Sequence, residues 1–214
     1  MKVLVMCDDK WHPAETVMNG LETLRQIGFH FKYMLASEDW REENFSEYAV
    51  LMLSKSNTLT RDDQSEWMSP QVEQSLLQFV EQGGGLLIVH SGIVGYKHSE
   101  VMLSLTGGFF EWHPEQCPVT VHFKDSHPLV SGLTDFTITD EHYFVQTVHE
   151  NKNNYLMDTC SSYGNQPGGW TRLCGQGRIC VLTPGHTPEV WHQEQMQQLL
   201  TRVLKGCGKA LGRS

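Results

Sequence analysis

Short apolar runs and amphipathic stretches alternate along the first ninety residues. The apolar runs are typical of buried strands and cover residues 2–6, 30–35, 48–53 and 86–89. Between them, residues 14–27 and 70–82 repeat apolar positions at helical spacing, and a glycine that can end the helix follows each. In the first helix, Val17, Leu21 and Ile27 are expected on the inner face. This strand–helix–strand order predicts right-handed crossovers and a mostly parallel central sheet with helices on both faces.

After about residue 115 the strands become shorter and are interrupted by polar residues. Residues 119–123, 136–139 and 155–158 are strand candidates. Residues 170–174 and 178–183 predict a hairpin across the turn Gly175-Gln176-Gly177. An amphipathic helix over residues 189–204 then closes the chain. With no internal repeat or linker, the pattern predicts one α/β domain over residues 1–214, with a C-terminal hairpin region added to the sheet.

The composition is that of a soluble globular protein, with 39% hydrophobic and 19% charged residues. The net charge of −9 disfavours nucleic acids and anionic membranes as partners, because contacts with phosphates require clustered Lys and Arg. No apolar run approaches the roughly 18 residues of a membrane helix, and the apolar start is too short for a signal peptide. We therefore predict a cytoplasmic protein with a small-molecule ligand. A homodimer is compatible with the sequence, although no heptad pattern argues for one.

The six cysteines include no C-x-x-C pair. Cys7, Cys174 and Cys180 lie in apolar strand-like runs. We interpret the cysteines as small buried hydrophobic residues rather than as disulfides or a thiolate metal site.

Ligands of parallel α/β sheets bind outside the carboxyl ends of the strands. This rule places residues 7–13, 54–58 and 90–97 on the rim of the site. His90 ends the fourth strand, where an imidazole can act as a general base or as a metal ligand, the alternative being a hydrogen bond to the backbone. Gly92 allows a ligand to approach the backbone closely. Ser91 is a minor candidate nucleophile with His186, because its flanks do not match G-x-S-x-G.

Aromatic and acidic residues in other loops complete the predicted site. In an extended segment 139–143, Glu141 and Tyr143 point to one side, and Asp140 and His142 point to the other. Glu141 beside histidines can orient an imidazole, transfer a proton or bind a metal, and the alternative is a solvated turn. The pairs Trp11-His12 and Trp112-His113 are expected as aromatic walls of the ligand site or, equally, as half-buried surface aromatics.

The 11 histidines include no H-E-x-x-H motif, so any metal site must be assembled from distant loops, an arrangement that the sequence permits and does not demand. The candidate ligands are His12, His90, Glu141 and His186, a set suited to zinc, manganese or iron. No phosphate-binding loop occurs, and Gly83-Gly84-Gly85 precedes a strand rather than following one. No nucleotide cofactor is therefore expected.

Several short motifs, in this order, resemble the ThuA-like (trehalose-utilisation) family. They are Asp9-Lys10-Trp11-His12-Pro13, Gly20-Leu21, the run Gly83 to Gly92, Gly107-Gly108 with His113-Pro114, His127-Pro128 with Gly132-Leu133, Asp140-Glu141 with Tyr143, and Gly175 to Arg178 leading to Gly185-His186 and Trp191. Each motif is weak alone, but their order extends over nearly the whole chain.

The resemblance implies a flavodoxin-like sandwich of the class I glutamine amidotransferase type. In that fold a strand ends in a catalytic cysteine, whereas here the corresponding strand ends in His90-Ser91-Gly92, so glutamine hydrolysis by a cysteine is not expected. His186-Thr187-Pro188-Glu189 is an altered version of the His-Pro-Glu segment that completes the amidotransferase triad, which places His186 at the position of the catalytic histidine. The resemblance also favours Glu141 over Asp140.

The family is associated with the use of trehalose and related disaccharides. This implies an enzyme of carbohydrate catabolism with His90, Glu141 and His186 as catalytic residues, acting on a keto-sugar or disaccharide-derived substrate as an isomerase, lyase or hydrolase. The alternative is a non-catalytic sugar-binding or regulatory domain that retains a degenerate pocket.

Overall fold

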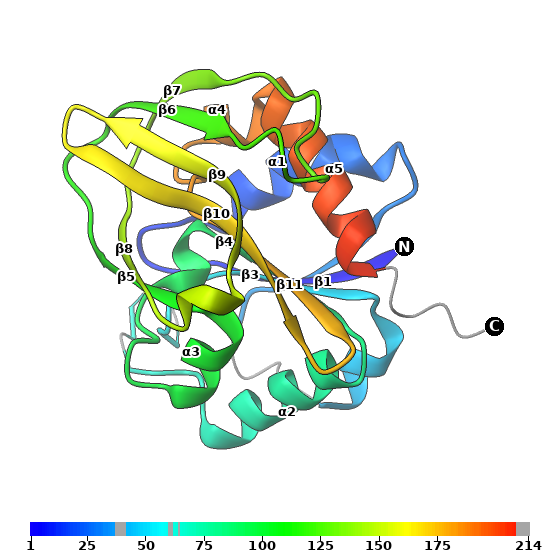
Figure 1. Cartoon of the computed structure of the whole chain (residues 1–214). Helices are drawn as coiled ribbons and strands as arrows, with labels where there is room; N and C mark the ends of the chain where they lie inside the picture. Colours follow the sequence, from blue (N-terminus) through cyan, green and yellow to red (C-terminus); the bar gives the residue numbers. More distant parts are fainter. Residues whose placement is uncertain (37–41, 60–61, 64, 209–214) are drawn as a thin grey trace.

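The computed structural model describes residues 1–36, 42–59, 62–63 and 65–208 (Figure 1). The helices are α1 (Ala14–Arg25), α2 (Pro70–Glu81), α3 (Glu100–Thr106), α4 (Pro188–His192) and α5 (Glu194–Gly208), with short 3-10 turns η2 (Glu42–Glu47), η3 (His90–Ile93) and η4 (Glu150–Lys152). The strands are β1 (Lys2–Cys7), β2 (His30–Met34), β3 (Val50–Ser54), β4 (Gly85–Val89), β5 (Gly108–Trp112), β6 (Cys117–Phe123), β7 (Phe136–Asp140), β8 (Phe144–Thr147), β9 (Asn154–Ser161), β10 (Gly164–Cys174) and β11 (Gly177–Leu182).

Nine strands form one sheet in the order β2-β1-β3-β4-β11-β10-β9-β6-β7. The α/β class is confirmed, with one difference: the sheet is mixed rather than mostly parallel. The pairs from β2 to β11 are parallel and those from β11 to β7 are antiparallel. The predicted β10–β11 hairpin joins the two halves, because β11 lies parallel to β4 and antiparallel to β10.

The parallel strands end together at one edge of the sheet. Cys7 of β1 is opposite Ser54 of β3, and Val89 of β4 is opposite Leu182 of β11. The segments that follow these strands, from residues 8, 55, 90 and 183, are therefore neighbours although they are far apart in the sequence. This is the edge at which the sequence predicted a ligand site.

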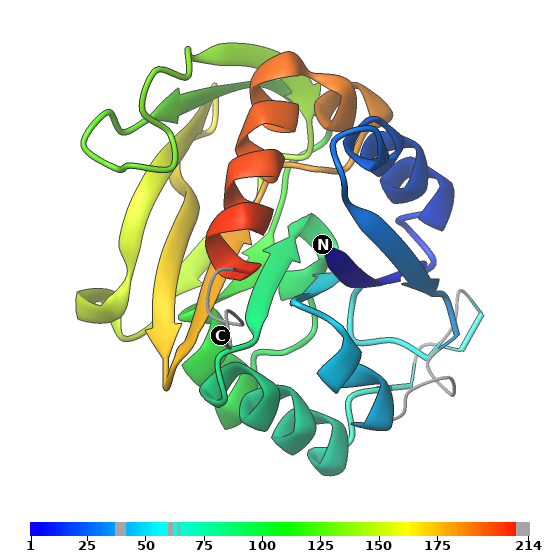
Figure 2. The same ribbon diagram turned by 90° about the vertical axis from the view of Figure 1, so that its right-hand side faces the viewer.

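Helices cover both faces of the sheet, so two apolar cores form (Figure 2). Alternation along β1 divides its side chains between them: Val3 and Val5 face the core of α1, α4 and α5, whereas Leu4 and Met6 face the core of α2 and α3. Both faces of the parallel strands are thus buried, which is why their sequences are continuously apolar.

Two of the predicted helices differ from their expected boundaries. Helix α1 ends at Arg25, and Ile27 lies in the following turn with 53% of its surface exposed, so its prediction as an inner-face residue is wrong. The C-terminal helix is divided at Gln193, whose ψ of 130° interrupts the helical backbone between α4 and α5.

The segment between residues 100 and 147 contains elements that the pattern did not indicate. Helix α3 has only seven residues, and β5 and β8 form a separate two-stranded antiparallel sheet. Trp112 of β5 stacks on Phe144 of β8, with ring centroids 4.3 Å apart. Short strands of this kind are defined by a partner distant in sequence rather than by their own periodicity.

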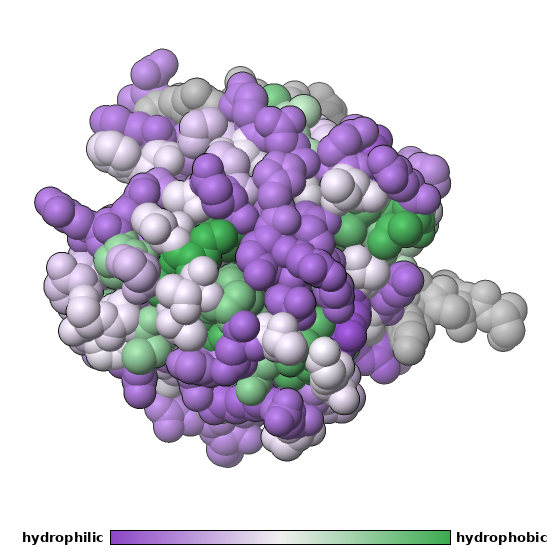
Figure 3. Space-filling model, turned by 90° about the horizontal axis from the view of Figure 1, so that it is seen from above, coloured by the Kyte–Doolittle hydropathy of each residue, from purple (hydrophilic) through white to green (hydrophobic). Residues whose placement is uncertain are grey.

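Within the described part of the chain, no helix is long and apolar enough to cross a membrane. Seen from above, the surface is mainly hydrophilic and its hydrophobic residues form separate patches (Figure 3). The predicted cytoplasmic location, the possible homodimer and the absence of nucleic-acid partners stay predictions.

Candidate functional site

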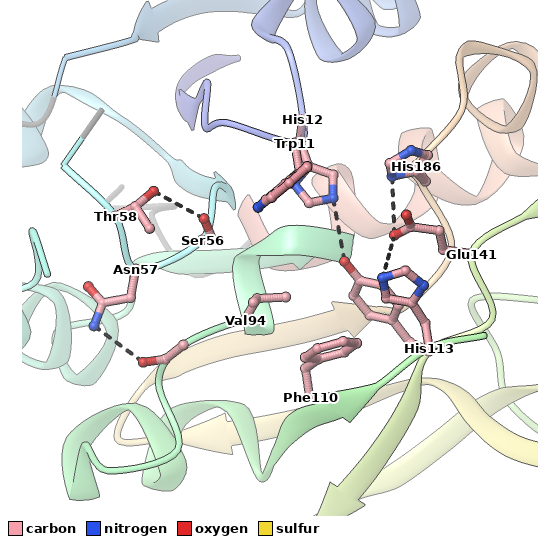
Figure 4. Close-up of a pocket in the computed structure, with 12 residues that line it drawn as sticks. Trp11, His12, Ser56, Asn57, Thr58, Val94, Phe110, His113, Glu141 and His186 are labelled. Atoms are coloured by element: carbon pink, nitrogen blue, oxygen red, sulfur yellow. Dashed lines mark hydrogen bonds and ion pairs between the residues drawn. The ribbon is translucent and has the colours of Figure 1, made fainter. Parts of the chain in front are cut away.

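A cavity of about 600 Å³ opens at the carboxyl edge of the parallel strands (Figure 4). Its lining comes from the loops after β1, β3 and β4, from β5 and from the segments after β7 and β11. The lining residues are Trp11, His12, Ser56, Asn57, Thr58, Val94, Gly95, Phe110, His113, Glu141, Tyr143 and His186. The volume is within the roughly 300–1,000 Å³ typical of small-molecule sites.

Three histidines and one carboxylate converge on one end of this cavity. One ligand atom from each of His12, His90, Glu141 and His186 lies within 4.8 Å of those of the other three. The Glu141 Oε2 atom is 3.3 Å from His90 Nε2 and 3.2 Å from His186 Nδ1. The four residues that were predicted as metal ligands from four separate loops are therefore brought together.

His90 is fixed by its backbone partner. Its Nδ1–H donates to the carbonyl of Thr183 at 2.8 Å, which leaves Nε2 without a hydrogen atom in the neutral ring. Burial lowers the pKa of His90 to about 4, so the ring is neutral near pH 7. Nε2, which has no hydrogen-bond partner among the described residues, then presents a lone pair to the Glu141 carboxylate. Two facing lone pairs repel unless a proton or a cation lies between them.

The backbone at the end of β4 places His90 against the loop that carries His186. His90 has a φ of 48°, an uncommon conformation for a residue other than glycine. A Cβ atom at Gly185 would lie 3.1 Å from His90 Cβ, so glycine permits the close contact between the two loops. The His90 ring stacks on Tyr143 with a centroid distance of 3.9 Å.

His12 is oriented by a buried carboxylate. Its Nδ1 is 2.8 Å from Asp9 Oδ1, which also accepts the backbone N–H groups of Trp11 and His12. Burial of Asp9 opposes ionisation, but these bonds and that from Ser56 N–H outweigh it and keep the pKa of Asp9 below its ordinary value. A neutral His12 therefore carries its proton on Nδ1 and directs Nε2 towards the other ligand atoms, 3.5 Å from the Tyr143 hydroxyl.

A second buried carboxylate, Asp140, positions the loop of His186. It accepts the backbone N–H groups of Gly185 at 2.9 Å and His186 at 3.0 Å. Burial raises the pKa of Asp140 to about 6, in spite of these bonds. The extended segment 139–143 thus has the predicted alternation: Glu141 and Tyr143 line the cavity, whereas Asp140 and His142 face away from it and are buried.

The electrostatics of Glu141 and His186 are coupled. Burial acts to raise the pKa of Glu141, but the ion pair with the His186 ring outweighs it and holds that pKa below its ordinary value. Burial conversely acts to lower the pKa of His186, and the Glu141 carboxylate outweighs it and raises that pKa. Glu141 is therefore an anion at neutral pH, as a metal-binding carboxylate must be.

These residues fit a divalent transition metal. His90 Nε2 and His186 Nδ1 are buried, and neither has a hydrogen-bond partner in the part of the chain that the structure describes. The outward nitrogens of His12 and His90 hydrogen-bond to a carboxylate and a carbonyl, the usual outer shell of metal-binding histidines. Three imidazoles and one carboxylate suit zinc, manganese or iron.

The other predicted binding residues fall into two groups. Trp11, His113 and Tyr143 line the cavity with the cluster, and His113 Nε2 is 3.6 Å from Glu141 Oε2. Ser91, Gly92 and Trp112 are not among the lining residues, and their predicted contact with a ligand in this cavity has no support. Ser91 and Gly92 are buried in η3, where a Cβ on Gly92 would be 2.1 Å from the Leu53 carbonyl oxygen; Trp112 lies against Phe144.

Several residues of the site were not singled out from the sequence. Ser56, Asn57 and Thr58 lie within the predicted rim segment 54–58 and form the end of the cavity away from the His/Glu cluster (Figure 4). Phe110 belongs to the unpredicted strand β5. Asp9 and Asp140 lie next to predicted residues, but their function depends on contacts with His12 and with Gly185 that the sequence does not reveal.

Solved structures of low sequence identity share this fold. A putative ThuA-like protein from Bacteroides uniformis ATCC 8492 matches with a TM-score of 0.75 at 18% identity, over 95% of this chain and 89% of that one. A cytoplasmic protein of Salmonella typhimurium LT2 matches with a TM-score of 0.72 at 13% identity, over 97% and 99%. A β-galactosidase from Bacillus circulans sp. alkalophilus matches with a TM-score of 0.67 at 14% identity, over 96% of this chain but 31% of its own.

No curated protein sequence matches the chain. The model of the ThuA family, described as "Trehalose utilisation", matches residues 2–205. The match covers nearly the whole chain, as the order of motifs in the sequence predicted, and it supports a carbohydrate-related role. The chain belongs to the ThuA family.

Proposed function

We propose that the protein is a metal-dependent enzyme that acts on a keto-sugar or a disaccharide-derived sugar in the cavity beside Glu141. The observation that carries this proposal is the convergence of His12, His90, Glu141 and His186, with ligand atoms within 4.8 Å, at one end of a cavity of about 600 Å³. Family membership supplies the carbohydrate class. The proposed ligands of the metal are these four residues.

A divalent metal in this position would act as a Lewis acid towards a sugar carbonyl or hydroxyl. The chain itself supplies a proton acceptor at the cavity wall. His113 Nδ1 is 2.8 Å from the carbonyl of Pro114 and donates to it, so a neutral His113 presents an unprotonated Nε2 towards Glu141. With Glu141 engaged as a ligand, we assign proton transfer to or from the substrate to His113.

The remaining walls suit an uncharged sugar. Trp11, with 66% of its surface exposed, and Phe110 offer apolar faces, and Ser56 and Thr58 offer hydroxyl groups. None of the twelve lining residues is Lys or Arg. The described lining residues therefore offer no Lys or Arg side chain to a sugar phosphate, and a neutral sugar is the better match.

Metal content is the first test. The protein is purified without chelators or a histidine tag and analysed by mass spectrometry, together with His90→Ala and His186→Ala. We expect near-stoichiometric zinc, manganese or iron in the wild type and its loss in both variants. His122→Ala is the matched control, because His122 is also paired with a carboxylate but lies at the surface.

Turnover is measured next on keto-sugars and disaccharides with the metal-loaded protein. We expect His113→Gln to lower kcat strongly while the metal stays bound. A folded protein that stays metal-free on titration excludes the metal-dependent mechanism. Sugar binding without turnover would instead identify a non-catalytic binding domain.

A further inference from the structure

A second cavity, of about 660 Å³, lies at the other end of β11 from the His/Glu site. It is formed by the turn-side ends of β10 and β11, the loop after β6, the residues around η4 and the end of α5. Its lining residues are His127, Pro128, Leu129, Lys152, Asn154, Thr171, Arg172, Leu173, Arg178, Ile179, Gly206 and Cys207. This cavity shares no lining residue with the proposed sugar site, and membership of the ThuA family assigns no ligand to it.

The charge of this lining is opposite to that of the whole chain. The chain has 25 acidic and 16 basic residues, but the lining includes Lys152, Arg172 and Arg178 and no Asp or Glu. Within the described ranges, none of the three takes part in an ion pair. An electropositive cavity on an acidic protein selects for an anion.

Arg172 places a fixed positive charge in the wall of this cavity. Only 5% of its surface is exposed, and its guanidinium bonds to the neutral acceptors Ser104 carbonyl and Asn153 Oδ1 rather than to a carboxylate. Its Nε is buried, and no described residue accepts a hydrogen bond from it. A buried cation that lacks a counter-charge is unfavourable, and a nearby anion would stabilise it.

The floor of the cavity is neutral and largely apolar. The Leu129 backbone N–H donates to His127 Nδ1 at 3.2 Å, so the neutral ring carries its proton on Nε2 and donates it to Thr171 Oγ1 at 3.2 Å. His127 is therefore satisfied within the protein. Leu129, Ile179 and Cys207 supply apolar contacts, and Leu173 has 76% of its surface exposed.

We propose that this cavity binds a small organic anion: an apolar body against Leu129, Leu173 and Ile179, with its carboxylate, sulfonate or phosphate group between Lys152 and Arg178. Such a ligand differs in charge and polarity from the sugar proposed for the first cavity. The second cavity is therefore a separate binding site.

Two dyes with nearly the same apolar body test the proposal. 8-Anilino-1-naphthalenesulfonate carries a sulfonate, and N-phenyl-1-naphthylamine does not. We expect the sulfonate dye to bind one site per chain at least fivefold more tightly than the neutral dye, with an affinity that falls as salt is added. Arg178→Gln and Lys152→Gln should each weaken it by about two- to fivefold, the range for single exposed charges. Lys32→Gln on β2 is the control, because it makes the same charge change away from the cavity.

Leu173→Glu provides a second variant, since the side chain is exposed and the fold should tolerate a carboxylate at this position. It should abolish binding of the sulfonate dye. Equal affinity for the two dyes, or wild-type affinity in both charge variants and in Leu173→Glu, would overturn the proposal. His186→Ala should bind the dye as the wild type does, so the result is independent of whether the sugar site holds a metal.

Discussion

At the scale of single residues, three histidines of the site are oriented by a hydrogen bond from Nδ1. His12 Nδ1 pairs with Asp9, His90 Nδ1 with the Thr183 carbonyl and His113 Nδ1 with the Pro114 carbonyl. Each partner selects one tautomer of the neutral ring and leaves Nε2 as an acceptor. Glu141, an anion at neutral pH, is near the Nε2 atoms of His90 and His113.

Asp9→Asn tests the importance of this outer shell. The amide keeps one oxygen but loses the charge that stabilises the His12 tautomer, so we expect metal affinity to fall about 10- to 100-fold. Competition with a zinc-chelating dye measures the change. Asp135→Asn is a matched control, because Asp135 also accepts from a histidine Nδ1, that of His122, and from the backbone N–H of Phe123, but at the surface. Equal zinc affinity in Asp9→Asn and the wild type would contradict the orienting function.

At the scale of elements, the turn from β4 into η3 brings His90 close to its neighbours. Gly92 lies against β3, and a Cβ atom on it would be 2.1 Å from the Leu53 carbonyl oxygen, a backbone atom that cannot turn aside. Gly92 therefore serves packing between the turn and the adjacent strand. A direct contact between Gly92 and a ligand is not required to explain this glycine.

We expect Gly92→Ala to destabilise the protein by about 1–3 kcal/mol, the usual effect of forcing an extra carbon into a packed interior. Urea unfolding followed by tryptophan fluorescence gives the free energy of unfolding. Gly132→Ala shows the effect of backbone strain alone, because Gly132 has a φ of 75° and no described atom lies within 4 Å of its added Cβ, whereas Gly92 lacks a positive φ. A Gly92→Ala variant as stable as the wild type would contradict the clash.

The division between α4 and α5 has a local cause in Gln193. Its side-chain oxygen accepts the backbone N–H groups of Gln195 and Met196, the first unpaired donors of α5. We expect Gln193→Ala to lower stability by about 0.5–2 kcal/mol, as loss of other helix caps does. Gln198→Ala on α5 is the control. Among the described residues the Gln198 side chain bonds only to Glu194 at the surface, so its loss should leave the unfolding midpoint nearly unchanged.

Elements with their own periodicity could be predicted from the sequence, and elements defined by distant partners could not. The apolar runs of β1, β3 and β4 and the stripes of α1 and α2 carry their signal locally. The strands β5 and β8 depend on each other across more than thirty residues. The prediction of one helix over residues 189–204 is wrong at Gln193, because the apolar stripe continues past this residue and its capping bonds leave no mark in the hydrophobic pattern.

The same distinction applies to the site. His90 and His186 follow strands that the pattern indicates, so the topology of a parallel sheet brings them together. Glu141 was favoured by family resemblance, because nothing local distinguishes it from Asp140. Asp9 and Asp140 support the site through hydrogen bonds to the His12 side chain and to the Gly185 backbone, respectively. These contacts form only in the complete fold, so the sequence pattern does not reveal them.

At the scale of the whole molecule, the two apolar cores lie on opposite faces of one sheet. The reactivity of cysteines on different elements can therefore show whether those elements unfold together. Cys7 on β1, Cys180 on β11 and Cys207 on α5 are buried in one core, whereas Cys117, Cys160 and Cys174 are partly exposed. All six are free. Cys7 and Cys180 are buried as predicted, but Cys174, at the turn end of β10, is only half-buried.

Thiol labelling with a disulfide reagent therefore tests the prediction of a single domain. Burial raises the pKa of Cys7 and Cys207 to about 12, so at pH 8 only about 1 in 10,000 of these thiols would be ionised even if the reagent had access. We expect rapid labelling of no more than three thiols in the native protein and of all six in denaturant. Raising the pH from 7 to 9 should speed the reaction of the accessible thiols and leave the buried three unlabelled.

The labelling rates of the buried three in increasing urea distinguish one folding unit from several. Because β1, β11 and α5 contribute to the same core, Cys7, Cys180 and Cys207 should become reactive together, at the concentration where tryptophan fluorescence reports global unfolding. Mass spectrometry of the labelled peptides assigns each rate to its cysteine. Labelling of Cys207 at much lower urea than Cys7 would show that α5 detaches first, and the chain would then not unfold as the single domain predicted for it.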